Sequence, residues 1–155
     1  MNISAIILAA GKSVRMGQQK MLMPWGNTTV LGKVIDTLQA AGIEDIVLVT
    51  NSKIAPQVTI YKLRVTFNDG GEMLTSIQLG LQAQKPSAEA TLICLGDQPQ
   101  VEERSVRNVS DAFRQNKSSI SYQAIKCGAD IPGWSQGNYG MRYCKCVRPN
   151  PCAIS

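Results

Sequence analysis

The 155-residue sequence contains no histidine, which removes the commonest general base and the commonest zinc ligand from consideration. It also has no apolar run of the roughly 20 residues that a transmembrane helix needs. The apolar run at residues 3–9 is short and no basic residue precedes it, so we expect no signal peptide. These absences favour a cytoplasmic protein that has no membrane partner.

Basic residues are in surplus, but the surplus is unevenly distributed. Residues 1–123 carry 12 basic and 10 acidic side chains, whereas residues 124–155 carry 4 basic and 1 acidic. Because the first 123 residues are nearly neutral, we expect no broad basic face and no nucleic-acid partner.

Paired C-x-x-C knuckles are also absent, although four cysteines lie near the C-terminus: Cys127, Cys144, Cys146 and Cys152. These four could be interpreted as a zinc site, but their spacing argues against it. The fifth, Cys94, lies in an apolar run and is expected to be a buried core thiol.

Apolar runs alternate with amphipathic segments along the chain. Strands are predicted at residues 3–9, 43–50, 90–95 and 118–123, with a less clear strand within 58–67. Helices are predicted at 27–41, 73–84 and 102–116. This alternation predicts an α/β fold with a mostly parallel, three-layer sheet. Ligands of such sheets bind where the strands end.

A loop of small residues (L-A-A-G, residues 8–11) follows the first predicted strand. Small residues let backbone N–H groups approach phosphate oxygens, and Arg15 and Lys20 can then neutralise a triphosphate. The loop is not a Walker A motif, because Ile6 stands where that motif needs glycine, and the Rossmann G-x-G-x-x-G pattern is absent. A plain glycine turn with exposed basic residues is the alternative.

Two more motifs follow predicted strands. Residues 68–76 (N-D-G-G-E-M-L-T-S) read as a turn before a helix, and for Thr75 and Ser76 helix capping is an alternative role. Residues 96–99 (G-D-Q-P) place Asp97 at a strand end, where a carboxylate can share a hard cation with phosphates. A simple turn aspartate before proline is the alternative.

Together these motifs resemble the nucleotidyltransferases with a MobA-like fold, and most closely the molybdenum cofactor cytidylyltransferases. The resemblance covers about residues 3–123 and implies a Rossmann-like nucleotidyltransferase fold. It also implies Mg²⁺-dependent transfer of CMP from CTP to a phosphorylated acceptor such as molybdopterin. Ala10 gives L-A-A-G rather than L-A-G-G, which favours CTP over GTP. Relatives that use sugar phosphates or methylerythritol phosphate share this loop, so the acceptor stays open.

The resemblance also implies roles for individual residues. Arg15 and Lys20 would contact phosphates, and Asp97 would hold the Mg²⁺ ion, so these three form the expected catalytic set. Glu72 departs from the family, because many members have glycine there. The implied nucleotide-binding residues are Leu8, Ala9, Ala10, Gly11, Lys20, Asn68 and Ser76.

After Gln123 the resemblance stops, because a G-H-P motif and a second metal-binding aspartate are missing. Asp130 is the only acidic residue after position 111, and its surroundings do not match. Residues 126–155 can be translated back into DNA with suitably chosen synonymous codons. When this DNA is translated in the reading frame that starts at the third base of each codon, the new sequence contains G-H-P and a helix-like L-W-x-x-I-L-x-M pattern. We therefore expect residues 124–155 to be out of frame and disordered. A diverged, naturally short tail is the alternative.

A frameshifted tail would leave the fold incomplete at the C-terminus and impair the transferase. Two other outcomes stay open for such a chain, namely a nucleotide-binding remnant without turnover and a truncated product with no function. Nucleotide-dependent stabilisation separates these two outcomes.

Overall fold

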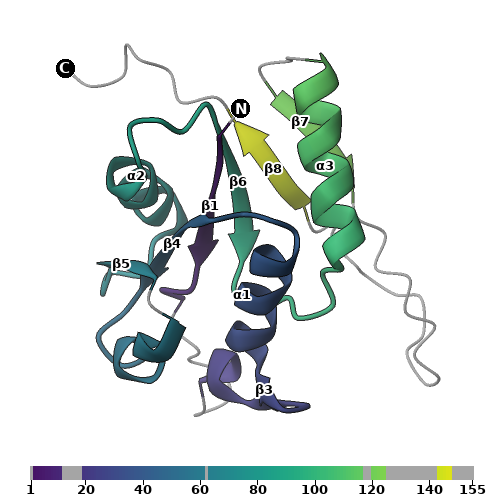
Figure 1. Cartoon of the computed structure of the whole chain (residues 1–155). Helices are drawn as coiled ribbons and strands as arrows, with labels where there is room; N and C mark the ends of the chain where they lie inside the picture. The colour runs from purple at the N-terminus through teal and green to yellow at the C-terminus, as the bar shows by residue number, and fades with distance from the viewer. Residues whose placement is uncertain (1, 12–18, 62, 117–119, 125–142, 148–155) are drawn as a thin grey trace, which may run out of the picture.

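The computed structural model describes residues 2–11, 19–61, 63–116, 120–124 and 143–147. They form an α/β fold around a six-stranded sheet with the order β5-β4-β1-β6-β8-β7 (Figure 1). The strands of this sheet are β1 (Ile3–Leu8), β4 (Asp45–Thr50), β5 (Arg64–Phe67), β6 (Ala90–Leu95), β7 (Ile120–Ala124) and β8 (Tyr143–Val147). The α-helices are α1 (Val30–Ala40), α2 (Met73–Ala83) and α3 (Glu103–Asn116). The predicted fold class is confirmed.

The sheet is mostly parallel, as predicted. Strand β1 pairs in parallel with β4 on one side and β6 on the other, and β4 pairs in parallel with β5. Strand β8 is antiparallel to both of its neighbours, β6 and β7. The strand ends of β1, β4, β5 and β6 therefore meet at one edge of the sheet.

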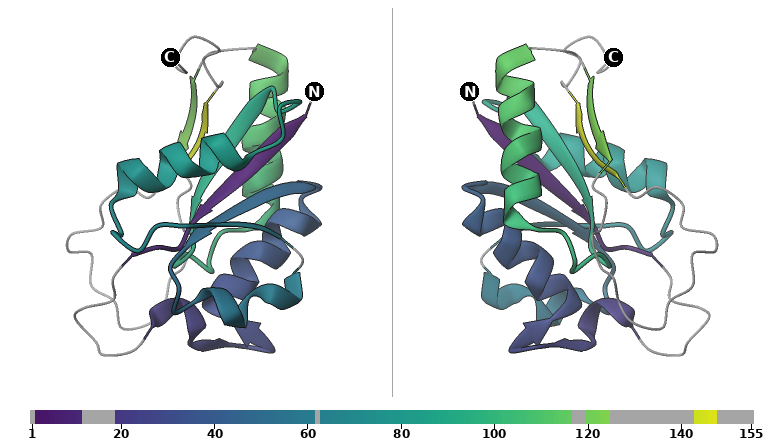
Figure 2. Two further views of the ribbon diagram at one scale, coloured as in Figure 1. Left: turned by 90° about the vertical axis from the view of Figure 1, so that its left-hand side faces the viewer. Right: turned by 90° about the vertical axis from the view of Figure 1, so that its right-hand side faces the viewer.

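The layers follow from the alternation of side chains along β1, which is buried on both faces. Ile7 and Ala9 face the cluster that includes Leu31 of α1 and Phe113 of α3, whereas Ile6 and Leu8 face the other cluster. That second cluster packs against α2. Figure 2 shows α2 on one side of the sheet and α1 and α3 on the other. The predicted three-layer arrangement is thus confirmed.

Helix α2 approaches the sheet closely because Gly80 carries no side chain. A Cβ atom at position 80 would lie 2.6 Å from Cγ2 of Ile6, which is fully buried. This contact seats the helix on the middle of β1 and so fixes where both of its ends lie.

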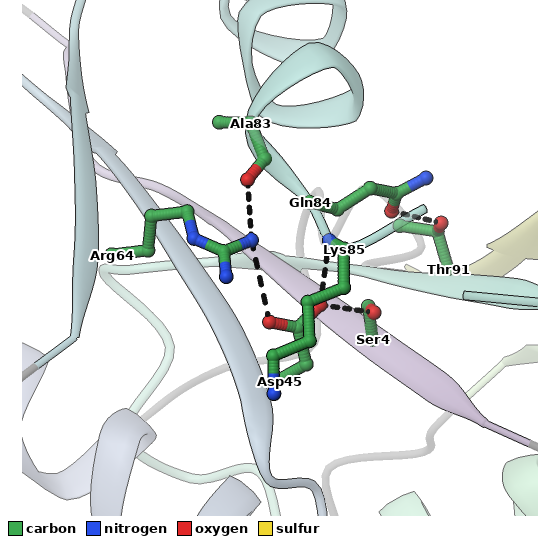
Figure 3. Close-up of polar contacts among 7 residues, drawn as sticks. All are labelled: Ser4, Asp45, Arg64, Ala83, Gln84, Lys85 and Thr91. Carbon is green, nitrogen blue, oxygen red and sulfur yellow. Dashed lines mark hydrogen bonds and ion pairs between the residues drawn. The ribbon is translucent and has the colours of Figure 1, made fainter. Parts of the chain in front are cut away.

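A polar network ties the C-terminal end of α2 to the edge where the strands begin (Figure 3). The Asp45 carboxylate accepts hydrogen bonds from the Ser4 hydroxyl (2.5 Å) and from the Lys85 backbone N–H (3.1 Å). The Arg64 guanidinium lies 3.5 Å from the same carboxylate and donates to the Ala83 carbonyl. These contacts connect β1, β4, β5 and the end of α2, and so hold the four elements together at this edge of the sheet.

The element boundaries differ from the predicted ones at the start of α1. The prediction began this helix at residue 27, but it begins at Val30, because the Thr29 hydroxyl caps it by accepting from the Gly32 N–H (3.0 Å). The residues before it form a short hairpin of β2 (Pro24–Trp25) and β3 (Thr28–Thr29).

The less clear segment 58–67 divides into two kinds of structure. Only Arg64–Phe67 forms a strand, whereas Ala55–Gln57 and Thr59–Tyr61 are short 3-10 helices. Pro56 stands in the first of these, where a missing N–H costs nothing.

The sequence predicts a disordered tail, and of residues 124–155 the structure describes only Ala124, which ends β7, and the segment Tyr143–Val147. This segment forms β8, which pairs with β6 through residues 91–93 and with β7 along its length. Ladder hydrogen bonds use only backbone groups, so an open strand edge can recruit a segment that lacks any side-chain periodicity. Within the described residues, no helix is long and apolar enough to cross a membrane.

Candidate functional site

The predicted site lies at the edge where the parallel strands end. Leu8 of β1 pairs with Leu95 of β6, and the Gly96 N–H donates to the Leu8 carbonyl (3.0 Å). The two chain segments that follow these strands therefore leave the sheet side by side. Glycine suits position 96, because a Cβ there would lie 3.2 Å from that of Ala9. The small-residue loop and the segment carrying Asp97 are thereby brought together.

Asp97 is exposed, in contrast to the residues on either side of it. Gly96, Gln98 and Pro99 are all buried, so the backbone of this segment is anchored while the carboxylate stays open to solvent. This arrangement holds a carboxylate at the strand end with no ion pair to another described residue, where it can bind a cation. Among the described residues, no group of three or more His, Cys, Asp or Glu side chains gathers around a common point.

The small-residue loop is anchored where it leaves β1. The Ala9 N–H donates to the Val49 carbonyl at 2.7 Å, and the Ala9 and Ala10 side chains are buried. Leu8 is a core residue of β1, and Gly11 is the first exposed position after it. Sequence reasoning missed Asn51, whose amide reaches the Ala10 carbonyl at 3.5 Å. An amide side chain directly after a buried strand was the available signal.

Lys20 lies at the start of a 3-10 helix, Lys20–Leu22, that follows the loop. Its side chain is exposed while that of Met21 is buried, so the packing of Met21 keeps the ammonium on the surface. Arg15, the other predicted phosphate contact, lies outside the described residues.

Asn68 and Ser76, also predicted to bind nucleotide, are brought together at the start of α2. The Asn68 amide donates to the Ser76 hydroxyl (2.8 Å) and to the Glu72 carbonyl (2.9 Å). Both side chains are buried. Helix α2 begins at Met73, so neither Thr75 nor Ser76 is its N-cap residue, and the capping alternative does not apply.

The loop after β4 is tied to the turn before α2. The Asp69 carboxylate accepts from the Ser52 N–H (2.9 Å) and from the Ser52 hydroxyl (3.1 Å). The side-chain oxygen Oδ1 of the neighbouring Asn51 accepts from the backbone N–H groups of Lys53 and Ile54. Segments that follow β1, β4 and β5 are thus joined by polar contacts at one edge.

Three buried polar atoms have no hydrogen-bond partner among the residues that the structure describes: Gln19 Oε1, Thr50 Oγ1 and Gln98 Nε2. Thr50 ends β4, and Gln98 directly follows Asp97. Unsatisfied buried polar groups are uncommon in proteins and often mark sites of function. Cys94, expected in the core, is indeed buried in β6.

A family model decides the relationship of this chain to known proteins: residues 5–134 match the MobA-like NTP transferase domain. The chain belongs to this family. The matched region includes the small-residue loop, the 68–76 turn and the G-D-Q-P segment, and extends beyond residue 123, where the resemblance in the sequence was judged to stop.

Individual relatives agree with the family assignment. The bifunctional protein GlmU of Syntrophomonas wolfei is 28% identical over 135 residues, which cover 81% of this chain and 29% of that protein. The crystal structure of Rv0371c from Mycobacterium tuberculosis has 30% identity and a TM-score of 0.68, covering 79% of this chain and 64% of that one. A complex of the same mycobacterial protein with manganese has also been solved, with a TM-score of 0.65. The chain therefore spans less than two thirds of these relatives.

A more distant neighbour supports the fold alone. The 4-diphosphocytidyl-2C-methyl-D-erythritol synthase of Anaerococcus prevotii has 23% identity and a TM-score of 0.70, over 95% of this chain and 70% of that one. The predicted Rossmann-like nucleotidyltransferase fold is confirmed.

Proposed function

We propose that this chain binds CTP with a divalent cation, and that its inherited reaction is transfer of CMP to a phosphorylated small molecule. The observation that carries the proposal is the pairing of Leu8 with Leu95, which sets the small-residue loop beside the exposed Asp97 carboxylate. Membership of the family supplies the reaction class.

The residues at this edge suit a metal-bound triphosphate. Mg²⁺ is usually held by one or two carboxylates together with substrate phosphates, so a single exposed Asp97 fits that donor set. A divalent cation there would neutralise charge that develops on the phosphates. The manganese complex of the mycobacterial relative supports a divalent cation of this kind, and Mg²⁺ is our proposal for this chain.

The protein's own part is binding and positioning. Backbone N–H groups of residues 9–11 would bind phosphate oxygens, and Lys20, with Arg15, would neutralise their charge. An acceptor phosphate would then attack the α-phosphorus in line, forming a new P–O bond as pyrophosphate leaves. Molybdopterin is the acceptor that we propose, because the sequence motifs most closely resemble those of the molybdenum cofactor cytidylyltransferases, and sugar phosphates are the alternative. A cytoplasmic location stays a prediction from the sequence.

Isothermal calorimetry with Mg-CTP tests the nucleotide site. We expect Asp97→Ala and Lys20→Ala each to weaken binding by about tenfold or more, since each removes one charge from the proposed phosphate and metal contacts. Exposed Lys85 provides a matched control, because it follows α2 at the opposite edge of the sheet, beside Asp45. If both variants bind Mg-CTP as well as the parent, the site assignment is wrong.

Nucleotide preference needs a separate competition experiment. The preference for CTP rests on Ala10 in the L-A-A-G loop alone. We expect CTP to displace GTP at lower concentration, and the reverse ranking would overturn this part of the proposal.

We also propose that residues 124–155 are frameshifted and that this chain turns over little or no substrate. Loss of an acceptor-binding segment removes the positioning that makes in-line attack frequent. The pairing of β8 is compatible with a shifted frame, because it uses backbone groups. Pyrophosphate release with CTP and molybdopterin should appear only when the reading frame after Gln123 is restored. Equal release by both proteins would contradict the proposal, as would a DNA sequence around codons 123–127 that permits no such shift.

A further inference from the structure

We infer that Asn68 and Ser76 are positioning residues of the proposed nucleotide site: they shape the turn at 69–72 and do not bond the nucleotide themselves. The inference rests on the proposed function and revises the direct role that the sequence resemblance implied for both residues. It follows from counting the hydrogen-bonding capacity that each side chain has already used.

The Asn68 amide has both of its N–H donors engaged inside the protein. Nδ2 donates to Ser76 Oγ at 2.8 Å and to the Glu72 carbonyl at 2.9 Å. Its oxygen Oδ1 accepts from the Gly71 N–H at 3.2 Å. A primary amide carries two N–H donors, so Asn68 has none left for a phosphate, a ribose or a base.

The Ser76 hydroxyl is committed in the same way. Its single hydrogen is donated to the Glu72 carbonyl at 2.9 Å, and its oxygen accepts from Asn68. The side chains are also recessed, since Ser76 is 3% and Asn68 is 7% exposed. A ligand at the surface would have to break this pair before it could bond either residue.

The pair holds a turn that needs such support. Gly71 has φ of 77°, a left-handed conformation that favours glycine, and its N–H is fixed by both oxygens of Asn68. Glu72 follows and precedes the first turn of α2, with its carbonyl engaged by both side chains of the pair. Removing either partner takes one hydrogen bond from the same carbonyl, which then keeps the other side chain and the Ser76 backbone N–H, and it also removes the bond between the two partners.

The turn is joined to the proposed phosphate loop by a chain of contacts. Asp69 accepts from Ser52, and Asn51, the neighbour of Ser52, reaches the Ala10 carbonyl at 3.5 Å. A change in the turn at 69–72 can therefore shift the segments that would surround the nucleotide. This route explains how two buried residues can affect affinity without touching the ligand.

A double-mutant cycle on nucleotide affinity separates the two roles. The variants are Asn68→Ala, Ser76→Ala and the double variant, titrated with Mg-CTP by calorimetry under conditions where circular dichroism shows each to be folded. If the residues act through one shared turn, each single change weakens binding by about tenfold and the double change weakens it hardly further. Losses that multiply to about a hundredfold would mean independent contacts with the nucleotide and would overturn the inference.

Two further variants make the cycle specific. Thr75→Ala removes the adjacent hydroxyl, which has no hydrogen-bond partner in the described part of the chain, and should leave affinity unchanged. Asn68→Asp keeps an oxygen that can accept from Gly71 but loses both donated bonds, so it replaces Asn68→Ala if that variant fails to fold. We expect it to weaken affinity by less than Asn68→Ala.

Hydrogen exchange without nucleotide provides a second readout. Both single variants should speed exchange of the Gly71 amide, because Asn68→Ala removes the side-chain oxygen that accepts from it and Ser76→Ala removes a bond that holds Asn68 in place. Unchanged exchange in both variants would overturn the inference. Failure of the proposed function looks different: the parent protein itself would bind neither Mg-CTP nor Mg-GTP. Normal affinity in both single variants, with a parent that binds, would contradict the positioning role alone.

Discussion

At the edge where the strands begin, the half-buried Asp45 is paired with Arg64 and accepts from Ser4 and Lys85, so its carboxylate oxygens are satisfied. At the opposite edge, where the strands end, Thr50 and Gln98 keep buried polar atoms that have no partner in the described part of the chain. Each such atom forgoes a hydrogen bond that water would have supplied in the unfolded chain. The first edge is built for stability, whereas the second carries unpaired groups.

Exposed apolar side chains show the same asymmetry. Phe67 ends β5, and Met73 and Leu74 open α2 directly after the turn. Trp25 lies in β2 and Met23 directly precedes that strand, whose partner β3 lies on the side toward which β1 runs (Figure 1). All five are large hydrophobic residues with at least two fifths of their surface exposed. Proteins tolerate such local violations mainly where a function needs them, which agrees with a ligand site at this edge.

The largest expected effect is on stability, from a change at the paired edge. Asp45→Ala should lower the free energy of unfolding by about 2 kcal/mol, since it removes the common acceptor of the network and leaves the Ser4 hydroxyl buried without a partner. Urea unfolding measures the loss. Affinity for Mg-CTP in the folded variant should match the parent, and a tenfold loss of affinity would mean that the two edges are not separate in function.

The helix that links the two edges provides the next test. Gly80→Ala should lower the free energy of unfolding by about 1–2 kcal/mol. The new methyl group would clash with Ile6, and the energy of this clash exceeds the gain from the higher helix propensity of alanine. Gln78→Ala, on the exposed face of α2, should be nearly neutral by comparison. Equal or higher stability of Gly80→Ala, measured by urea unfolding, would show that α2 is not seated as described.

Asp97→Asn should affect the ligand and leave the fold intact. We expect the affinity for Mg-CTP to fall by about tenfold, equivalent to about 1.4 kcal/mol, with the melting temperature of the free protein unchanged. The reason is that Asp97 is exposed and its carboxylate has no partner in the described structure that it could lose. A parent-like dependence of CTP affinity on Mg²⁺ concentration in this variant would remove Asp97 from the metal site.

The smallest effect comes from a matched pair of fully buried threonines, one at each edge. Thr50→Val should raise stability by about 1 kcal/mol, because it replaces an unpaired buried hydroxyl with a methyl group. Thr91→Val should instead lower stability by about 1 kcal/mol, because Thr91 donates to Gln84 at 2.7 Å. Changes of the same sign in thermal unfolding would contradict the difference between the edges.

Much of the fold could be predicted because a strand that is buried on both faces of a sheet consists mainly of apolar residues, a pattern that is easy to find in the sequence. The runs that form β1, β4 and β6 are mostly apolar and rich in β-branched residues, and α1 and α2 show helical spacing of their apolar residues. The site residues at strand ends could be predicted for the same reason, since parallel strands bring their ends to one edge. Asp97 and the loop at 8–11 needed only the strand assignment to be placed together.

Other features depend on contacts that sequence patterns do not record. The hairpin of β2 and β3 has only two residues in each strand, too few for any period to appear. Strand β8 is held by backbone pairing with segments more than fifty residues away in β6. The partnership of Asn68 with Ser76 depends on a particular turn geometry, so the sequence could nominate both residues but not show that they bond each other.

Hydrogen exchange of the full chain, with and without saturating Mg-CTP, tests the central claim most directly, because it reports on both edges at once. We predict slower exchange in the segments that follow the strand ends, at residues 8–11, 68–76 and 96–98, and unchanged exchange around Ser4, Asp45 and residues 83–91. Slowing confined to the edge around Asp45 would contradict the account. No slowing anywhere with Mg-CTP in large excess over the protein would also contradict it.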